Sequence, residues 1–442
     1  MIEKTVRASC APALPVALAL VLAVAGCGQK IAPPNTQYGA NPRLPAPRQY
    51  ILPPMRVPQA AGWEAGETPV APAGFKVAAL ATGFLHPRSV YTLPNGDILV
   101  VETNGPKPPI NRPKDYVMGL VKDYATPDVK AGNRIILLRD THGDGRPDLR
   151  TVFIDHLTSP FGVVLVDNDL YVADTNAILR FPYVAGQTHI TAPGTRLTDL
   201  PAGPINHHWT KSLTASPDGS KLYVGVGSNS NITENGIAVE VGRAAIWEVD
   251  RATGLKRIFA SGLRNPTGLG FEPGTARLWA IVNERDEIGP NLVPDYMTSV
   301  RQGAFYGWPY SYFGQHIDVR VQPQRPDLVA KAISPDYALS SHVAPLGLAF
   351  SQASSFPAAY RDGAFVSEHG SWDRDPLNGY KVVYVPFKDG RPSGPPQDLV
   401  TGFLAKDGRA HGRPVGLALD HTGALLIADD VVNTVWRVSR QG

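Results

Sequence analysis

Cysteine is nearly absent from this sequence, which has two cysteines among 442 residues. Cys10 lies in an apolar N-terminal segment that we expect to be removed, so the mature chain keeps Cys27 alone. No intramolecular disulfide is then possible, and a large apolar core must supply the stability. The sequence also lacks a Cys-x-x-Cys-His motif, which excludes a covalently attached haem.

An excess of charge of one sign is missing too. The formal net charge is +3 and no block of like charges appears, so the sequence gives no support for nucleic-acid binding. No Gly-rich loop follows a strand and opens a helix, which argues against a nucleotide cofactor. No histidine and cysteine cluster has the spacing of a zinc site. Long amphipathic helical patterns are scarce, which argues against a βαβ fold.

The N-terminus has the features of an export signal over residues 1–26. Lys4 and Arg7 precede an apolar run that is short for a membrane span. The last four residues, Val24-Ala25-Gly26-Cys27, are similar to the end of bacterial lipoprotein signals, which implies cleavage before Cys27 and a lipid on its sulfur. A lipidated Cys27 excludes a thiol enzyme. The alternative is a plain secretory signal in which Cys27 has no role.

Residues 27–72 are dense in proline and poor in apolar runs, which is typical of a semi-rigid extended tether. This tether would hold the remaining domain, residues 73–442, away from a membrane surface. We therefore expect the protein on the periplasmic side of the cell envelope, anchored through its lipid to the outer membrane.

One short pattern recurs six times along the domain: a polar or Pro-containing lead-in, a small apolar strand, a turn with glycine, and a second strand that ends near Asp or Glu. The copies begin at His86, Ser159, His207, Arg264, Ala344 and Gly412. Asn95-Gly96 and Asp218-Gly219 supply turns of the kind that join tight hairpins. Six such copies predict an all-β fold, a six-bladed β-propeller. A two-layer sandwich would not explain why the same lead-in recurs.

Candidate functional residues lie at the lead-ins, because the entry loops of propeller blades gather at one mouth of the central channel. His207 and His208 are candidate bases near neutral pH, although a loop histidine is often structural. Arg264-Asn265-Pro266 combines a cation, an amide and a rigid turn, which suits an anionic ligand. A solvated surface turn is the other interpretation.

Two acidic loops resemble calcium-binding segments. Residues 282–291, "VNERDEIGPN", place Glu284 and Asp286 after a strand end, where carboxylates and backbone carbonyls can hold calcium. Residues 140–148, "DTHGDGRPD", are spaced more like a calcium loop, but His142 and Thr151 stand where ligand oxygens belong. We interpret this second loop as a turn between blades, with a peripheral structural calcium site as the alternative.

Several motifs, taken together and in order, carry a family resemblance. They are "HWTKSLTASPDGSKLYVGVGSNSN", "SGLRNPTGLGFEP", "NERDE", "FYGWPYSYFGQH", "EHGSWDR" with "GYKVVYVPF", and "GRPVGLALD". The chain resembles the pyrroloquinoline quinone (PQQ)-dependent sugar dehydrogenases, including the sorbosone dehydrogenase branch and the soluble glucose dehydrogenases. The likeness covers about residues 75–438. It implies a propeller whose mouth holds the quinone and a calcium ion.

The resemblance implies roles for individual residues. His208 is the expected catalytic base, and Arg264 with Asn265 contacts the cofactor, Arg264 also stabilising negative charge during catalysis. Arg374 and Arg413 are expected to hold the carboxylates of the cofactor. Glu284 and Asp286 fall where the family supplies calcium.

Three positions depart from the family pattern. The second arginine of the sixth blade is replaced by Val415, the acid beside the base by His207, and a glutamine near the second lead-in by Ser159. These departures put sugar preference and quinone affinity in question more than the fold.

The expected function is oxidation of an aldose or a sugar aldehyde such as sorbosone, with hydride transfer to calcium-bound PQQ. Electrons would then pass to a cytochrome c or a membrane quinone, between which the sequence does not choose. Two alternatives stay open: a calcium-dependent sugar lactonase, and a propeller that only binds partners at the envelope. A lactonase would leave Arg264, Arg374 and Arg413 without a common role. A propeller that only binds partners would not need the polar and charged residues of the lead-ins.

Overall fold

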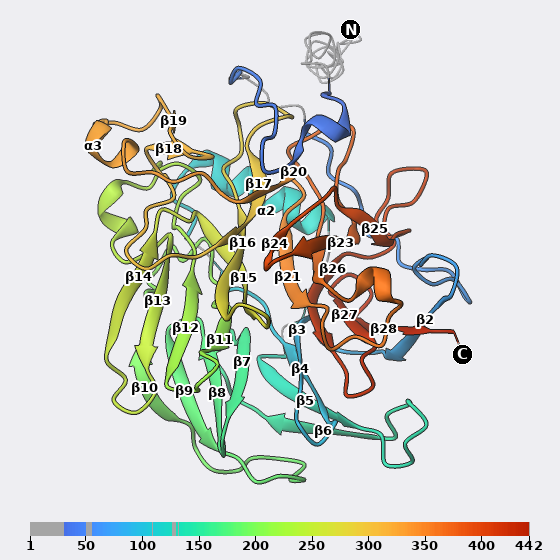
Figure 1. Ribbon diagram of the computed structural model, residues 1–442. Coiled ribbons are helices and arrows are strands. Elements are labelled where there is room, and N and C mark those ends of the chain that lie inside the picture. The colour runs from blue at the N-terminus through green and yellow to red at the C-terminus, as the bar shows by residue number, and fades with distance from the viewer. Residues whose placement is uncertain (1–30, 50–54, 108, 126–129, 131, 442) are drawn as a thin grey trace, which may run out of the picture.

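The structure of the protein is a computed structural model that describes residues 31–49, 55–107, 109–125, 130 and 132–441 (Figure 1). The expected signal segment and Cys27 lie outside the described residues. Within the described part of the chain, no helix is long and apolar enough to cross a membrane.

Six antiparallel sheets follow one another along the chain and form the blades of a propeller. Their first strands contact each other in chain order, β3, β7, β11, β15, β21 and β26, and β26 contacts β3 again. This last contact closes the ring. The prediction of a six-bladed β-propeller is confirmed.

The first three blades have four strands each. Blade 1 contains β3 (Pro87–Thr92), β4 (Ile98–Glu102), β5 (Arg134–Arg139) and β6 (Leu149–Ile154). Blade 2 contains β7 (Gly162–Val166), β8 (Asp169–Asp174), β9 (Ala177–Pro182) and β10 (Thr195–Asp199). Blade 3 contains β11 (Leu213–Ala215), β12 (Lys221–Val226), β13 (Ala245–Asp250) and β14 (Lys256–Ser261).

Blades 4 and 5 carry extra strands. Blade 4 contains β15 (Asn265–Glu272), β16 (Arg277–Asn283), β17 (Pro294–Ser299) and β20 (Tyr337–Ser341), to which β1 (Tyr38–Gly39) is added. Blade 5 contains β21 (Pro345–Phe350), β22 (Gly363–Glu368), β23 (Lys381–Lys388), β24 (Arg391–Pro392) and β25 (Gln397–Val400).

Blade 6 joins the two ends of the domain. It contains β26 (Pro414–Leu419), β27 (Leu425–Asp429) and β28 (Thr434–Arg440), and its outer strand is β2 (Phe75–Ala81) from the N-terminal side. Phe75 pairs with Arg440 and Val77 with Val438.

The remaining elements are short and lie in connections. They are α2 (Pro113–Ala125), α3 (Pro326–Val329), the 3-10 turns η2 (Pro34–Thr36), η3 (Ile237–Glu240) and η4 (Ala358–Tyr360), and the hairpin β18 (Ser311–Tyr312) with β19 (His316–Ile317). Helix α2 begins at Pro113, and the Asp115 carboxylate accepts the backbone N–H groups of Asn111 and Arg112 at 3.2 and 2.9 Å. Proline at a helix start and an acid in the first turn both favour initiation there.

Burial explains why the sequences of the inner strands are continuous apolar runs. Strands β4, β22 and β27 are buried along their whole length because a neighbouring blade covers each face. The outer strands β10 and β14 are far more exposed. The predicted turns also form, with Gly96 and Gly219 at φ of 91° and 70°, a region that glycine adopts without strain.

The acid at the end of the second strand, which recurs in the sequence, has a structural role in three blades. Glu102 accepts the backbone N–H of Leu85 at 2.9 Å, and Asp174 accepts that of Thr158 at 2.9 Å. Asp429 accepts the N–H of Arg413 at 2.9 Å. Each acid therefore fixes the lead-in of its own blade at the mouth.

The N-terminal segment contacts the propeller. Strand β1 pairs with β20, and the side chain of Gln37 donates to Asn291 at 2.9 Å and accepts from Ser340 at 2.8 Å. Val70 exchanges backbone hydrogen bonds with Thr401. In the described part of the expected tether, these contacts hold the chain against blades 4 and 5; the domain boundaries themselves stay a prediction.

Candidate functional site

The lead-ins and the ends of the second strands lie at one end of the propeller. The first two strands of a blade are antiparallel, so the residue before the first strand and the residue after the second come together. In blade 4, Asn265 at the start of β15 pairs with Asn283 at the end of β16. We call this end of the propeller the mouth.

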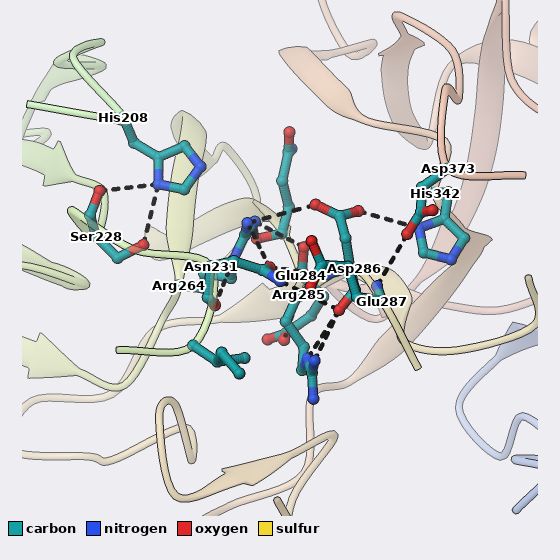
Figure 2. Close-up of polar contacts among 12 residues, drawn as sticks. His208, Ser228, Asn231, Arg264, Glu284, Arg285, Asp286, Glu287, His342 and Asp373 are labelled. Carbon is teal, nitrogen blue, oxygen red and sulfur yellow. Dashed lines mark hydrogen bonds and ion pairs between the residues drawn. The ribbon is translucent and has the colours of Figure 1, made fainter. Parts of the chain in front are cut away.

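His208 precedes blade 3 and is held by Ser228, as Figure 2 shows. Its Nδ1 lies 2.9 Å from the Ser228 carbonyl oxygen and 3.0 Å from the Ser228 hydroxyl. A carbonyl only accepts, so Nδ1 carries the proton and the lone pair is on Nε2. Burial, with the positive charge of Arg264 and then His207, holds the pKa of His208 well below its usual range. His208 is therefore neutral at pH 7 with an open Nε2.

Arg264, also expected at the site, is buried, and its guanidinium group donates hydrogen bonds to other groups of the protein. Its Nε and Nη2 donate to the carbonyl and side-chain oxygens of Asn231 at 3.2 and 3.0 Å, and its Nη1 donates to the Glu284 carbonyl at 2.7 Å. Nη2 lies 3.6 Å from the Asp286 carboxylate. Arg264 thus fixes the acidic loop beside His208 and contributes positive charge to the mouth.

Asn265 offers an open acceptor. Its side-chain oxygen is buried and has no hydrogen-bond partner in the described structure. A Cβ on Gly227 would lie 2.3 Å from this oxygen and 2.5 Å from the Cβ of His208. Only glycine at position 227 lets Asn265 and His208 approach each other.

The acidic loop of blade 4 is buried, unlike an exposed calcium loop. Burial raises the pKa of Glu284 to about 7. Asp286 places one carboxylate oxygen 3.2 Å from Nδ1 of His342 and the other 3.6 Å from Arg264. The Asp286 carboxylate, with Asp373 adding to it, outweighs burial and raises the pKa of His342 to about 9.

These contacts test whether the loop fits calcium. Ligand atoms of Asp286, His342 and Asp373 lie within 4.8 Å of one another, but both ring nitrogens of His342 already face acceptors, the Asp286 carboxylate at 3.2 Å and the Gly289 carbonyl at 3.1 Å. Both Asp286 oxygens already face cations, and calcium takes six to eight oxygens. In this arrangement Glu284 and Asp286 supply fewer oxygens than calcium takes, and the calcium site stays a prediction.

The other acidic loop joins β5 to β6 within blade 1, so its interpretation as a turn between blades was wrong. Asp140 accepts four backbone N–H groups of the loop, from residues 142 to 145. Asp148 accepts both the N–H and the hydroxyl of Thr141. Hydrogen bonds within the loop therefore orient both carboxylates.

Arg374 and Arg413 lie in different surroundings. Nη1 of Arg374 contacts the side-chain oxygen of Gln37 at 3.4 Å and the Pro290 carbonyl at 3.0 Å, so this arginine secures the N-terminal segment. Arg413 lies over the ring of Tyr380 at 5.4 Å and has one long hydrogen bond, 3.4 Å, to the Tyr380 hydroxyl. Arg413 therefore keeps most of its donors for a ligand.

A second polar cluster, missed from the sequence, surrounds Asp430 after β27. Arg88 forms an ion pair with this carboxylate, and Nε2 of His369 lies 3.0 and 3.2 Å from its two oxygens. His86 Nε2 is 3.6 Å away. We call this cluster with Arg413 the Asp430 side of the mouth, and His208 with Arg264, Glu284 and Asp286 the His208 side.

The three departures fall in distinct places. His207 is exposed, and its ring lies 4.6 Å from that of His208, edge to face. Ser159 is buried with a φ of 46° at the blade 2 lead-in. Val415 is fully buried in β26 and its carbonyl accepts the Ser367 hydroxyl, so it faces the packing between blades.

Residues 135–304 and 320–441 match the family model described as TrAA12-like. The chain belongs to this family. A pyrroloquinoline quinone-dependent pyranose dehydrogenase of Coprinopsis cinerea is 23% identical over 431 residues, which cover 83% of this chain and 54% of the fungal enzyme. The chain thus spans about half the length of that relative. The resemblance to PQQ-dependent sugar dehydrogenases is confirmed at the level of the family.

Solved structures show the same fold. The holo form of the PQQ domain of Coprinopsis cinerea pyranose dehydrogenase has a TM-score of 0.68 and 21% identity, covering 87% of this chain and 100% of that domain. A calcium structure of a Trichoderma reesei enzyme of carbohydrate-active family AA12 has a TM-score of 0.67 and 19% identity, covering 84% and 97%.

Proposed function

We propose that the protein is a PQQ-dependent dehydrogenase that oxidises an aldose or a sugar aldehyde, with His208 as the catalytic base. The observation that carries this proposal is the state of His208 at the mouth of a TrAA12-like propeller. Its Nδ1–H is held by Ser228, its Nε2 is unprotonated, and Asn265 lies beside it.

In this proposal His208 accepts, at Nε2, the hydroxyl proton of an aldose or of a hydrated sugar aldehyde. The Ser228 carbonyl keeps the ring in one tautomer and accepts the Nδ1 proton while the imidazole becomes positive. The neighbouring cations that keep His208 neutral also limit its basicity. The proton transfer to His208 must therefore accompany the loss of hydride from the carbon that bears the hydroxyl group. Asn231 holds the acidic loop in place: its side-chain oxygen accepts the Asp286 N–H at 2.9 Å and Arg264 at 3.0 Å.

The residues present fit an anionic, flat cofactor. Arg413 offers open donors for a carboxylate, and the buried side-chain oxygen of Asn265 has no partner among the described residues and can accept from a donor. When bound, PQQ supplies the hydride acceptor. Calcium, by contrast, needs oxygens beyond those of Glu284 and Asp286, and no step of the proposal depends on it.

The finer predictions remain part of the proposal. They are a sorbosone-like aldehyde as substrate, a cytochrome c or membrane quinone as electron acceptor, and a lipid on Cys27 that anchors the protein on the periplasmic side of the envelope. The relative named a pyranose dehydrogenase supports a sugar substrate.

The test uses the purified protein titrated with PQQ, with and without calcium, followed by absorbance and by the thermal unfolding midpoint. Dye reduction is then measured with a panel of aldoses and sugar aldehydes. We expect quinone binding and quinone-dependent turnover. No quinone binding under either condition would refute the proposal, and hydrolysis of sugar lactones without quinone would favour the lactonase instead.

The role of His208 is tested in the same assay. His208→Gln should still bind the quinone but lose turnover by about 100-fold or more. His207→Gln is the matched control, because it removes the exposed neighbouring imidazole and should have a small effect. Full activity of His208→Gln would contradict its role as the base.

A further inference from the structure

A cavity of about 610 Å³ lies between blades 3 and 4, away from the mouth. It is reached at the other end of β15, where Phe271 and Arg277 flank the turn into β16. Six residues of strand separate Phe271 from Asn265 at the mouth, which is about 20 Å. The cavity is therefore a separate site, and its volume is that of a small-molecule pocket.

Aromatic rings form one wall of the cavity. The ring of Tyr223 lies 5.0 Å from that of Phe259 and 5.5 Å from that of Phe271, both edge to face. Tyr223 is buried, whereas Phe259 and Phe271 are partly exposed to the cavity. This wall presents ring faces and edges to a ligand.

Three arginines line the same cavity: Arg277 at the start of β16, Arg301 after β17, and Arg391 in β24. In the described part of the chain, no carboxylate forms an ion pair with any of them. Elsewhere on the propeller arginines commonly have such partners, for example Arg139 with Asp97 and Arg437 with Asp420.

The carboxylates next to this cavity already have hydrogen-bond or ion-pair partners other than the three arginines. Glu248 accepts the Tyr223 hydroxyl at 2.8 Å and pairs with Arg257 at 2.8 Å. Asp336 accepts the N–H and the hydroxyl of Ser299, each at 2.7 Å. Glu272, the cross-strand partner of Arg277, is likewise held by the N–H groups of Gly274 and Thr275. The three arginines are therefore left with guanidinium groups that an anion in the cavity would neutralise.

We propose that this cavity binds a small aromatic anion, with its ring system on the wall of Tyr223, Phe259 and Phe271 and its phosphate or carboxylate on the arginines. Guanidinium groups bind such anions through paired hydrogen bonds and also stack on aromatic ligands. This site does not depend on the dehydrogenase activity proposed for the mouth. It gives the protein a second ligand on the opposite end of the propeller.

Calorimetric titration with 1-naphthyl phosphate tests the proposal. PQQ is itself an aromatic anion, so the titrations are made on purified protein without added quinone. The ligand 1-naphthol has the ring without the charge, and inorganic phosphate has the charge without the ring. We expect 1-naphthyl phosphate to bind at least about tenfold more tightly than either. Equal affinity for 1-naphthol or for phosphate would overturn the proposal.

Variants locate the binding. Arg301→Gln and Arg277→Gln should each weaken 1-naphthyl phosphate binding about tenfold. Arg440→Gln removes an exposed arginine of β28 in blade 6 and should leave the affinity unchanged. All three positions are exposed, so the thermal midpoint should stay that of the wild type. If Arg301→Gln and Arg277→Gln bind like Arg440→Gln, the cavity is not the site.

Discussion

The two sides of the mouth hold histidine in different ways. On the His208 side a backbone carbonyl fixes the imidazole, and its charged neighbours are cations. On the Asp430 side a carboxylate contacts His369 and is shared with Arg88. A carbonyl orients a histidine without adding charge, which suits a base. A shared carboxylate instead joins blades 1, 5 and 6 through an ion pair with Arg88 and a hydrogen bond with His369. The difference teaches that the partner of a mouth histidine indicates its role.

The largest expected effect tests this difference in catalysis. If only the His208 side supplies the base, His208→Gln should lower dye-coupled turnover about 100-fold or more, and His369→Gln should lower it less than about tenfold. Both variants are assayed with saturating quinone. Equal losses in the two variants would break the comparison.

The Asp430 side should matter more for stability. Asp430→Asn removes the shared charge and leaves the partly buried Arg88 without its ion pair, so the free energy of unfolding should fall by about 3 kcal/mol in urea denaturation. Asp407→Asn, which breaks an exposed pair with Arg409, is the control and should leave the urea midpoint nearly unchanged. Similar midpoints for the two variants would show that the cluster does not join the blades.

A pH series sharpens the role of His369. Burial, opposed by Asp430, lowers the pKa of His369 to about 4. The unfolded histidine titrates near 6.5, so the unfolded state binds more protons between these values and stability falls as pH drops from 6.5 to 4. His369→Gln should lose less stability than the wild type over this window. The check is the difference between the two urea unfolding curves at each pH, and parallel curves would contradict it.

The smallest expected effect is on PQQ affinity and concerns Arg413, whose guanidinium group has few partners. Arg413→Gln should raise the dissociation constant of PQQ about tenfold, because one charge-assisted hydrogen bond is lost. The unfolding midpoint should change little, since Arg413 makes only a ring contact and one long hydrogen bond. Unchanged quinone affinity would remove Arg413 from the cofactor site.

Much of the fold was predictable because its signals are local. Asn95-Gly96 and Asp218-Gly219 turns, flanked by apolar runs, mark the first two strands of blades 1 and 3, and both hairpins form. The partner of β2 was not predictable, since strand patterns do not say which edges meet. The insertion that carries α2 was missed because its helical pattern is short and isolated in a β-rich chain.

The site was predictable only in part. His208 and Asn265 stand in recognisable lead-ins, and the structure brings them together around Gly227. His342 is a single residue after β20 that meets Asp286 within blade 4. Asp430 of blade 6 meets Arg88 of blade 1 only because the ring closes. For Asp430 a signal existed, the acid that ends each second strand, but its neighbour Asp429 fills that structural role and obscures it.

The pairing of β2 with β28 sets an order for folding during synthesis. Strand β2 leaves the ribosome first, yet its partner is made more than 350 residues later. Until β28 emerges, blade 6 is incomplete and the edges of β2 and blade 1 stay open to unwanted pairing. The longest delay between synthesis of two paired strands therefore falls in blade 6, which closes the ring. A chaperone that shields Phe75–Ala81 until β28 is made would protect this closing step.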